Sequence, residues 1–201
     1  MEKDYIGYNF WYINNEQYDN KVPQLRKYSK STNSIARTND ANYTYFVANV
    51  TGGYVFTNKS KSCIWVTDFF DDRIYIYSDS LKLTKCISGP DGITPDFMSV
   101  NKDNYNYIVF EKGKTYRGYL AYTTTDKHIY LVYEGTNGTP YQTMDLPPVE
   151  VFKFDWEGNL LSTYQLDKYI YTISVDSSEK YLYGTSCNSY EGEIVFIRYP
   201  I

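Results

Sequence analysis

The chain repeats one pattern three times, and this repetition limits its possible folds more than any single motif does. The pattern is a strand, a polar turn and a second strand, and its copies read GYVFTNKSKSCIWVTD (53–68), GYLAYTTTDKHIYLVYEG (118–135) and YTISVDSSEKYLYGTS (171–186). A second hairpin follows each of the first two copies, whereas the single strand EIVFIRYPI (193–201) follows the third. Repeated units of four antiparallel strands are typical of propeller blades.

The composition supports an all-β fold. Aromatic residues make up 19% of the chain and 25 residues are tyrosine, which suits pleated, half-buried strands. Apolar and polar residues alternate strictly at 73–77 and 149–154, and no stretch of a dozen residues keeps a helical period. We therefore predict β-propeller-type blades of four antiparallel strands, about four blades of which two are partial. The single domain divides into a partial blade at 5–40, a blade at 43–88, a connector at 89–115, a blade at 116–167 and a partial blade at 169–201.

Short strands are also expected inside the less regular segments. Their predicted positions are 6–13, 24–28 and 34–37 in the N-terminal part and 105–110 in the connector. The connector is longer than most links between elements, so we expect it to carry either function or strands of its own.

Charge and terminal sequence narrow the possible partners. The formal net charge is −4, and acidic and basic residues are well mixed, so no basic stripe favours nucleic acid. The N-terminal sequence MEKDYIGYNFWYINNEQ has neither the basic and apolar regions of a signal peptide nor a run that could span a bilayer. We predict no nucleic-acid partner and no membrane-spanning segment.

No cofactor or metal site is predicted. Cys63, Cys86 and Cys187 are widely spaced and odd in number, so we expect buried thiols instead of a disulfide framework or a zinc site. His128 is the single histidine; it could act as a general base only if a carboxylate oriented it, and we expect a partly exposed residue at a strand edge.

Two acidic motifs are interpreted as turns. Asp68, Asp71 and Asp72 lie close enough in sequence to suggest a calcium site, but their side chains also suit turns, because Asp bonds readily to nearby backbone. In the hairpin 155–159 we expect Gly158 to supply a positive φ and Trp156 to pack over a neighbouring blade.

Several longer segments together resemble a known family. They are DDRIYIYSDSLKLTKCISGPDGITPDF (71–97), GYLAYTTTDKHIYLVYEG (118–135) and VEVFKFDWEGNLLSTYQLDKYIYTISVDSSEKYLYG (149–184). Over roughly residue 53 to the end, the chain resembles the TolB-like six-bladed propeller family common in gut Bacteroidetes. The resemblance implies a six-bladed propeller, often in an exported, envelope-associated protein, with no assigned activity and no catalytic residues to transfer.

The chain departs from that family in length. Four blades cannot complete a ring of six, so we expect it to correspond to the C-terminal two-thirds of such a protein. The strand at 6–13 could pair with 193–199 to close a small ring, but we favour an open arc whose blade edges allow self-association, because unpaired edges are templates for further pairing. The localisation stays open, because the resemblance implies export while the N-terminus carries no signal-peptide pattern.

The favoured function is a non-catalytic propeller module that binds a protein, peptide or glycan through loops at one end of the blades. The ligand-binding candidates lie in or beside connections and are Asp91, Asp96, Tyr105, Tyr116, Arg117 and Tyr141. The first alternative is a carbohydrate-active hydrolase or lyase that uses channel-facing carboxylates such as Asp91, Asp96 or Glu134. The second alternative is a truncated fragment without independent activity.

Overall fold

The computed structural model describes the backbone at residues 5–8, 25–29, 34–37, 53–58, 60–94, 98–102, 105–109, 116–135, 146–187 and 193–201. Every regular element in these ranges is a β-strand. No described segment is a helix with the length and hydrophobicity that crossing a membrane would require.

The strands form four antiparallel sheets and one separate hairpin. The first sheet holds β1 (Tyr5–Tyr8), β2 (Leu25–Ser29) and β3 (Ser34–Arg37). The second sheet holds β4 (Gly53–Asn58), β5 (Cys63–Asp68), β6 (Ile74–Ser78) and β7 (Leu83–Ile87). The third sheet holds β10 (Arg117–Thr124), β11 (His128–Gly135), β12 (Glu150–Asp155) and β13 (Leu160–Gln165). The fourth sheet holds β14 (Thr172–Val175), β15 (Tyr181–Cys187) and β16 (Ile194–Pro200), and the hairpin is β8 (Met98–Lys102) with β9 (Tyr105–Val109).

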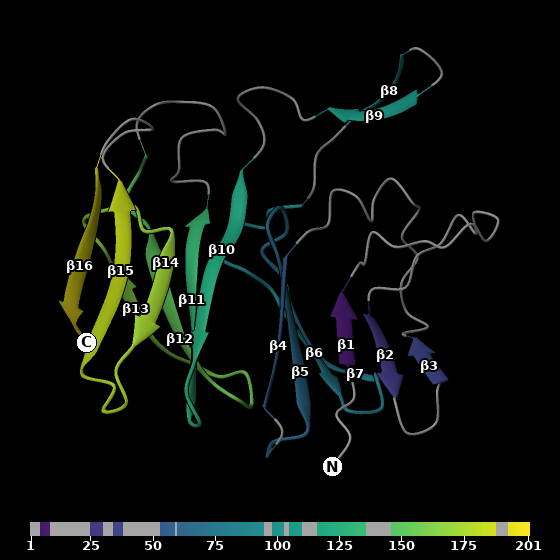
Figure 1. Ribbon diagram of the computed structural model, residues 1–201, viewed down its shortest axis with the longest axis horizontal. Helices are drawn as coiled ribbons and strands as arrows, with labels where there is room; N and C mark the ends of the chain where they lie inside the picture. Colours follow the sequence, from purple (N-terminus) through teal and green to yellow (C-terminus); the bar gives the residue numbers. More distant parts are fainter. Residues whose placement is uncertain are drawn as a thin grey trace.

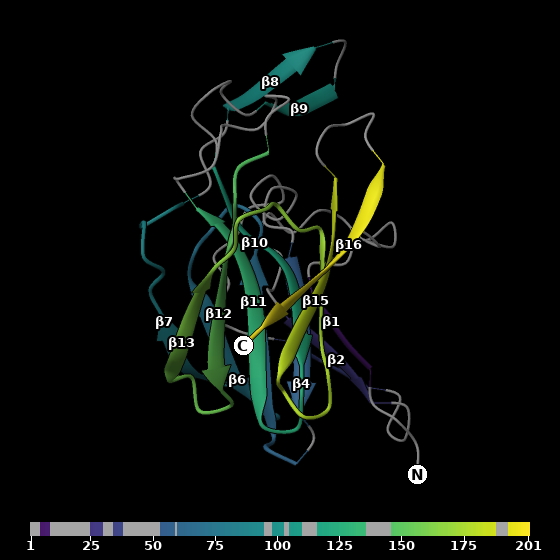
Figure 2. The same cartoon turned by 90° about the vertical axis from the view of Figure 1, so that its left-hand side faces the viewer.

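The four sheets stand side by side in chain order (Figure 1). The first strand of each sheet lies against that of the next sheet, so that β1 contacts β4, β4 contacts β10 and β10 contacts β14. The first and fourth sheets lie at opposite ends of this row (Figures 1 and 2). Among the described strands, no hydrogen-bonded ladder joins these two sheets. The predicted fold class is confirmed: the protein is all-β, with open, propeller-like sheets.

The second and third sheets pack through aromatic side chains. Trp65 of β5 is fully buried, and its ring centroid lies 6.4 Å from that of Trp156, which follows β12. Gly158 in the same turn has a φ of 82°, a value that glycine adopts without steric cost. Both predictions for the 155–159 hairpin are therefore confirmed.

β11 is buried on both faces, because a core lies on each side of it. Ile129, Leu131 and Tyr133 face the core shared with the second sheet, whereas Tyr130 and Val132 face the core shared with the fourth sheet. Successive strand residues point to opposite faces, so a strand covered on both sides reads as a continuous apolar run. This explains the sequence HIYLVY.

The prediction of buried thiols is wrong for the two cysteines whose side chains are described. Cys63 is only partly buried, and Cys86 is exposed because it lies on β7, the outer strand of the second sheet. Cys187 lies in β15, but its side chain is outside the described residues.

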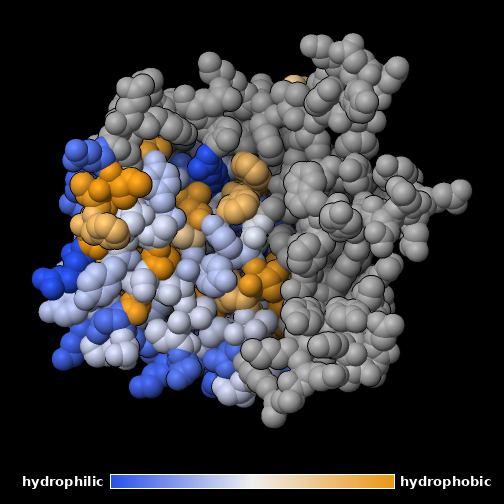
Figure 3. Space-filling model, in the orientation of Figure 1, coloured by the Kyte–Doolittle hydropathy of each residue, from blue (hydrophilic) through white to orange (hydrophobic). Residues whose placement is uncertain are grey.

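The outer strand of the fourth sheet exposes apolar side chains. Ile194 is 71% exposed and Phe196 is 89% exposed, with Val195 between them. In Figure 3 hydrophobic atoms gather at the upper left, over β16. Within the described residues β16 pairs only with β15, so its other edge carries no ladder there.

Candidate functional site

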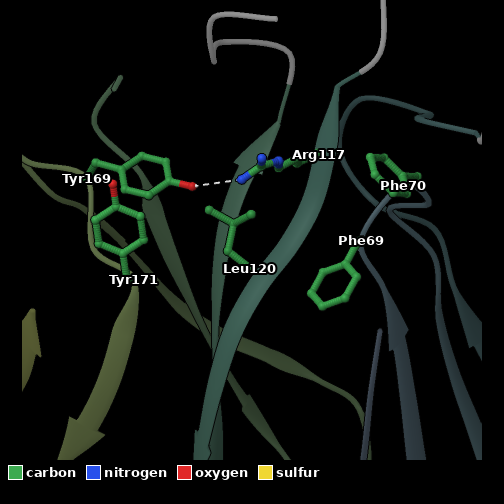
Figure 4. A pocket seen from close by; sticks show the side chains of 6 residues that line it. All are labelled: Phe69, Phe70, Arg117, Leu120, Tyr169 and Tyr171. Carbon is green, nitrogen blue, oxygen red and sulfur yellow. Dashed lines mark hydrogen bonds between the residues drawn. The ribbon is translucent and has the colours of Figure 1, made fainter. Parts of the chain in front are cut away.

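A turn of the second sheet, strand β10 and the connection between the third and fourth sheets enclose a cavity of about 270 Å³ at one end of β10. We call it the aromatic pocket, and its lining residues are Phe69, Phe70, Arg117, Leu120, Tyr169 and Tyr171. Figure 4 shows the two phenylalanines on one side, the two tyrosines on the other, and Arg117 and Leu120 between them. Among its described lining residues, the pocket therefore has two aromatic walls and one guanidinium.

The phenylalanine wall belongs to a hydrogen-bonded turn between β5 and β6. The Oδ1 atom of Asp68 accepts the backbone N–H of Phe70 at 2.9 Å, and Oδ1 of Asp71 accepts that of Arg73 at 2.8 Å. Such bonds are the usual way in which Asp stabilises a turn. The turn interpretation of this acidic motif is confirmed. The described residues contain no group of three or more side chains that could hold a metal ion.

Gly118 lets this turn approach β10 closely. Its N–H donates to the carbonyl of Phe69 at 2.7 Å. A Cβ atom at this position would lie 2.8 Å from the backbone oxygen of Asp71, which is closer than carbon and oxygen normally approach. A side chain at Gly118 would therefore push the phenylalanine wall away from β10.

Arg117 and Leu120 enter the pocket from β10, the first strand of the third sheet. Arg117 is the first residue of β10 and pairs with Gly135 at the end of β11. The hydroxyl of Tyr54, in β4, donates a hydrogen bond to the carbonyl of Leu120. This bond connects the part of β10 that lines the pocket to the second sheet.

The tyrosine wall comes from the connection between β13 and β14. Ile170 is fully buried and anchors this connection, and the N–H of Tyr171 donates to the carbonyl of Thr185 at 2.9 Å. The rings of Tyr169 and Tyr171 contact each other edge to face, with centroids 5.0 Å apart. Tyr169 is buried, whereas Tyr171 is 43% exposed, so Tyr171 offers most of the accessible surface of this wall.

A buried carboxyl group lies behind the tyrosine wall. Nη1 of Arg117 donates to the hydroxyl of Tyr169 at 3.4 Å, and this hydroxyl in turn donates to Oε2 of Glu134 at 3.4 Å. Burial raises the pKa of Glu134 to about 7, while the charge of Arg117 and the bond from Tyr169 limit the rise. The charge beside the pocket therefore changes near neutral pH.

A polar cluster lies at the other end of β10. Glu179, in the turn between β14 and β15, accepts four hydrogen bonds from side chains of the third sheet. The donors of this Glu179 cluster are Thr125 Oγ1 at 2.6 Å, Tyr130 OH at 3.0 Å and Lys153 Nζ at 3.2 Å, with His128 Nδ1 at 2.5 Å when that nitrogen is protonated. A carboxylate thus orients the single histidine, beside a second cavity of about 490 Å³ lined in part by His128 and Glu179.

The structure places the predicted site residues in different surroundings. Arg117 lines the aromatic pocket. Asp91 is exposed, and its Oδ2 accepts the hydroxyl of Tyr133 at 2.9 Å. Tyr116 is partly buried against the core between the second and third sheets. Tyr105 lies in β9, where only the backbone is described. Asp96 and Tyr141 lie outside the described residues.

Most of the aromatic pocket was not predicted from the sequence. Tyr171 is the first residue of the third repeat and Tyr169 lies two residues before it, and neither was among the candidates. Phe69 and Phe70 follow β5 directly, and two adjacent phenylalanines just after a strand ending in Asp were the available signal. Two large apolar side chains at a polar turn suggest a binding surface.

The sheets are antiparallel and stand side by side with their first strands adjacent, and the pocket lies at the end of one of these strands. This arrangement is that of the β-propeller class. A family model described as TolB-like 6-blade propeller-like matches residues 3–178. The chain belongs to this family, in agreement with the resemblance noted in the sequence.

A member of the DUF4221 family from Bacteroides vulgatus is similar in structure, with a TM-score of 0.48 and 14% sequence identity. The alignment covers 90% of this chain and 56% of that protein, so the chain spans little more than half of that structure's length. A search of the curated proteins found no match.

Proposed function

We propose that this protein is a non-catalytic binding module that holds a peptide or glycan ligand in the aromatic pocket. The observation that supports this most is the pocket at one end of β10, which combines a turn of the second sheet, β10 itself and the connection between the third and fourth sheets. Aromatic side chains supply large contact areas at a small entropic cost, which suits ligand binding on a rigid scaffold. Tyr171 is the more exposed of the two tyrosines that form the tyrosine wall.

The alternative of a carbohydrate-active enzyme has less support. Cleavage of a glycosidic bond ordinarily needs two carboxyl groups on either side of the bond. Among the described residues that line the aromatic pocket, none carries a carboxylate. Glu134 lies behind Tyr169, and the carboxylate of Asp91 accepts a bond from Tyr133. This arrangement favours binding over hydrolysis.

Glycan and peptide arrays provide the test, with two matched tyrosine variants. Tyr171→Ala removes an exposed ring from the pocket, and Tyr183→Ala removes a ring of similar exposure, 41%, from β15. We expect Tyr171→Ala to weaken binding of any array ligand by about tenfold or more, and Tyr183→Ala to leave it unchanged. Equal loss in both variants, or binding that Tyr171→Ala does not affect, would place the ligand elsewhere and refute the proposal.

We also propose that a second copy of the chain pairs with the exposed edge of β16. The fourth sheet has three described strands where the second and third have four. Its outer strand exposes Ile194 and Phe196, and an apolar edge strand is a template for pairing. Isologous contact between two β16 edges would cover this surface in both copies.

A further inference from the structure

The second cavity lies between two hairpin turns, one joining β10 to β11 and the other joining β14 to β15 (Figure 1). The first turn contributes Thr125, Asp126 and His128 to its lining, and the second contributes Ser177 and Glu179. Its volume of about 490 Å³ falls within the range of roughly 300 to 1,000 Å³ that is usual for ligand pockets. Val175 is the one aliphatic side chain among its described lining residues. The second cavity is therefore polar, unlike the aromatic pocket.

Glu179 orients His128 beside this cavity. Nδ1 of the imidazole lies 2.5 Å from Oε2 of Glu179. Burial by itself opposes ionisation of Glu179, but its hydrogen bonds lower its pKa to about 2, so the carboxylate accepts a bond donated by Nδ1–H. In a neutral imidazole the other nitrogen, Nε2, is then a hydrogen-bond acceptor. No group in the described part of the chain bonds Nε2, and the side chain of His128 is 22% exposed. Nε2 is therefore available to a ligand.

Three other polar side chains of the lining have no partner among the described residues. They are Asp126, Lys127 and Ser177. The carboxylate only accepts hydrogen bonds, the ammonium group only donates them, and the hydroxyl does both. The charges of Asp126 and Lys127 balance each other, and Lys153 Nζ lies 3.2 Å from Oε2 of Glu179. The cavity thus mixes donors and acceptors without a strong excess of either charge.

The backbone accepts strain in order to place Glu179 here. In the turn after β12, the N–H of Gly158 donates to the carbonyl of Asp155 at 3.1 Å, and the N–H of Glu179 donates in the same way to that of Asp176 at 2.9 Å. Both fourth residues have a positive φ, 82° for Gly158 and 53° for Glu179. Glycine adopts such a value without steric cost, whereas strained residues of other types are common at functional sites.

We propose that the second cavity binds a small neutral saccharide, with one sugar hydroxyl donating to Nε2 of His128 and neighbouring hydroxyls bonded to Asp126 and Ser177. Every sugar hydroxyl both donates and accepts, so adjacent hydroxyls on a ring match a lining of mixed donors and acceptors. The balanced charges favour a neutral ligand over an anion. The inference goes beyond the proposed function, because it concerns a different cavity.

Nitrogen NMR tests the role of His128 directly, because the chain has a single histidine and its ring gives the only imidazole signals. At pH 8 we expect a proton on Nδ1 and none on Nε2. Titration with glucose, galactose, mannose, N-acetylglucosamine, maltose and lactose should shift the Nε2 signal with at least one of these sugars. Inorganic phosphate and glycylglycine, which probe for an anion site and a peptide site, should leave the signal unchanged.

Variants of the lining test the other contacts. Ser177→Ala and Asp126→Ala each remove an exposed group that has no partner among the described residues, so the fold should be kept. Each should weaken binding of the sugar that responds by about two- to tenfold. Ser174→Ala, at an exposed position of β14 outside the described lining, is the matched control and should bind as the unchanged protein does.

Glu179→Gln tests Glu179 as a positioning residue. Without the carboxylate, part of the proton population should move from Nδ1 to Nε2, a change that a purely structural role would not produce. Affinity for the sugar should fall at the same time, because protonated Nε2 no longer accepts a hydrogen bond. An unchanged proton distribution in this variant would refute the assigned role of Glu179.

The remaining outcomes decide the ligand class. If none of the six sugars shifts the Nε2 signal, or if phosphate or glycylglycine shifts it as much as any sugar does, the saccharide assignment is wrong. A proton on Nε2 of the unchanged protein at pH 8 would overturn the acceptor role of His128. Tyr171→Ala, in the aromatic pocket, should leave the sugar titration unchanged, so this experiment and the array experiment decide the two proposals separately.

Discussion

The Nδ1 atom of His128 lies 2.5 Å from Oε2 of Glu179, and this contact joins the third sheet to the fourth. Glu179 has a φ of 53°, in the left-handed region that glycine and asparagine adopt more readily. A glutamate is strained there, and strained residues persist where surrounding contacts over-determine them. The hydrogen bonds of the Glu179 cluster are the contacts that do so.

Glu179→Ala should lower the free energy of unfolding by about 1 to 3 kcal/mol, because it leaves the donors of the third sheet without their acceptor. Glu179→Gly removes the same bonds but relieves the backbone, so it should be less destabilising by roughly 1 kcal/mol. Urea unfolding measures both. Glu157→Ala, at an exposed surface ion pair, is the control and should change stability by less than about 1 kcal/mol. Equal losses at Glu157 and Glu179 would contradict this assignment.

Acid should weaken the same cluster. Burial by itself would raise the pKa of Glu179, but its hydrogen bonds lower the pKa to about 2, from 4.5 in an unfolded chain. A lowered folded-state pKa contributes stability above pH 4.5, and this contribution is lost as the pH falls from 4.5 towards 2. Thermal unfolding across this range should show a smaller decline for Glu179→Gln than for the unchanged protein. If both proteins lose the same amount of thermal stability over this range, carboxyl groups other than Glu179 cause the loss.

Glu134 should have the opposite effect on stability. Its pKa is raised from 4.5 to about 7, mainly by burial, so the folded protein binds a proton that the unfolded chain releases. Its contribution is complete below pH 4.5 and declines as the pH rises to 7, by up to about 3 kcal/mol. Glu134→Gln should be more stable than the unchanged protein at pH 8, and the two should converge near pH 4.5. Chemical unfolding at both values checks this, and a constant difference would contradict it.

Gly118→Ala should disturb the aromatic pocket. The new Cβ would lie 2.8 Å from the backbone oxygen of Asp71, so the turn that carries the phenylalanine wall must move. Overpacking of this kind costs about 1 to 3 kcal/mol. Gly92→Ala separates steric from conformational effects, because nothing lies within 4 Å of its Cβ but its φ is +66°. Ligand affinity should fall in Gly118→Ala and not in Gly92→Ala.

Phe196→Asp should reduce self-association through β16. A charge at an apolar strand edge opposes pairing with a second copy. Light scattering after size exclusion should show a dimer for the unchanged protein and a monomer for Phe196→Asp. Leu160→Asp places the same charge on β13, at a residue that is 55% exposed, and should leave the dimer intact. A monomeric unchanged protein would contradict the pairing.

Strand positions could be predicted because their signals are local. Matching the chain to the four-strand blade pattern predicted strands at 24–28 and 34–37, and the length of the connector suggested one at 105–110. The structure has β2, β3 and β9 there within one or two residues. The predicted strand at 6–13 overlaps β1, and its part beyond Tyr8 lies outside the described residues.

The candidate site was predicted only in part. Arg117 was a candidate because it stands at the boundary between a connector and a strand, and it does line the aromatic pocket. Phe69 and Tyr171 were not candidates, because adjacency to a strand does not show which way a side chain faces. The exposure of Cys86 was missed for a related reason. Its strand is the outer strand of the second sheet, and the sequence of one strand does not show its position in the sheet.

The sequence by itself determined the all-β class and the hairpin repeats, because strand periodicity and turn chemistry act over a few neighbouring residues. Its longer segments resemble the TolB-like propeller family, and the match to the family model shows that the chain belongs to it. Only the tertiary structure decided which residues of different sheets meet. His128 and Glu179 are 51 residues apart, and the walls of the aromatic pocket come from separate sheets. Such meetings depend on how neighbouring sheets pack and twist against each other, which no local pattern records.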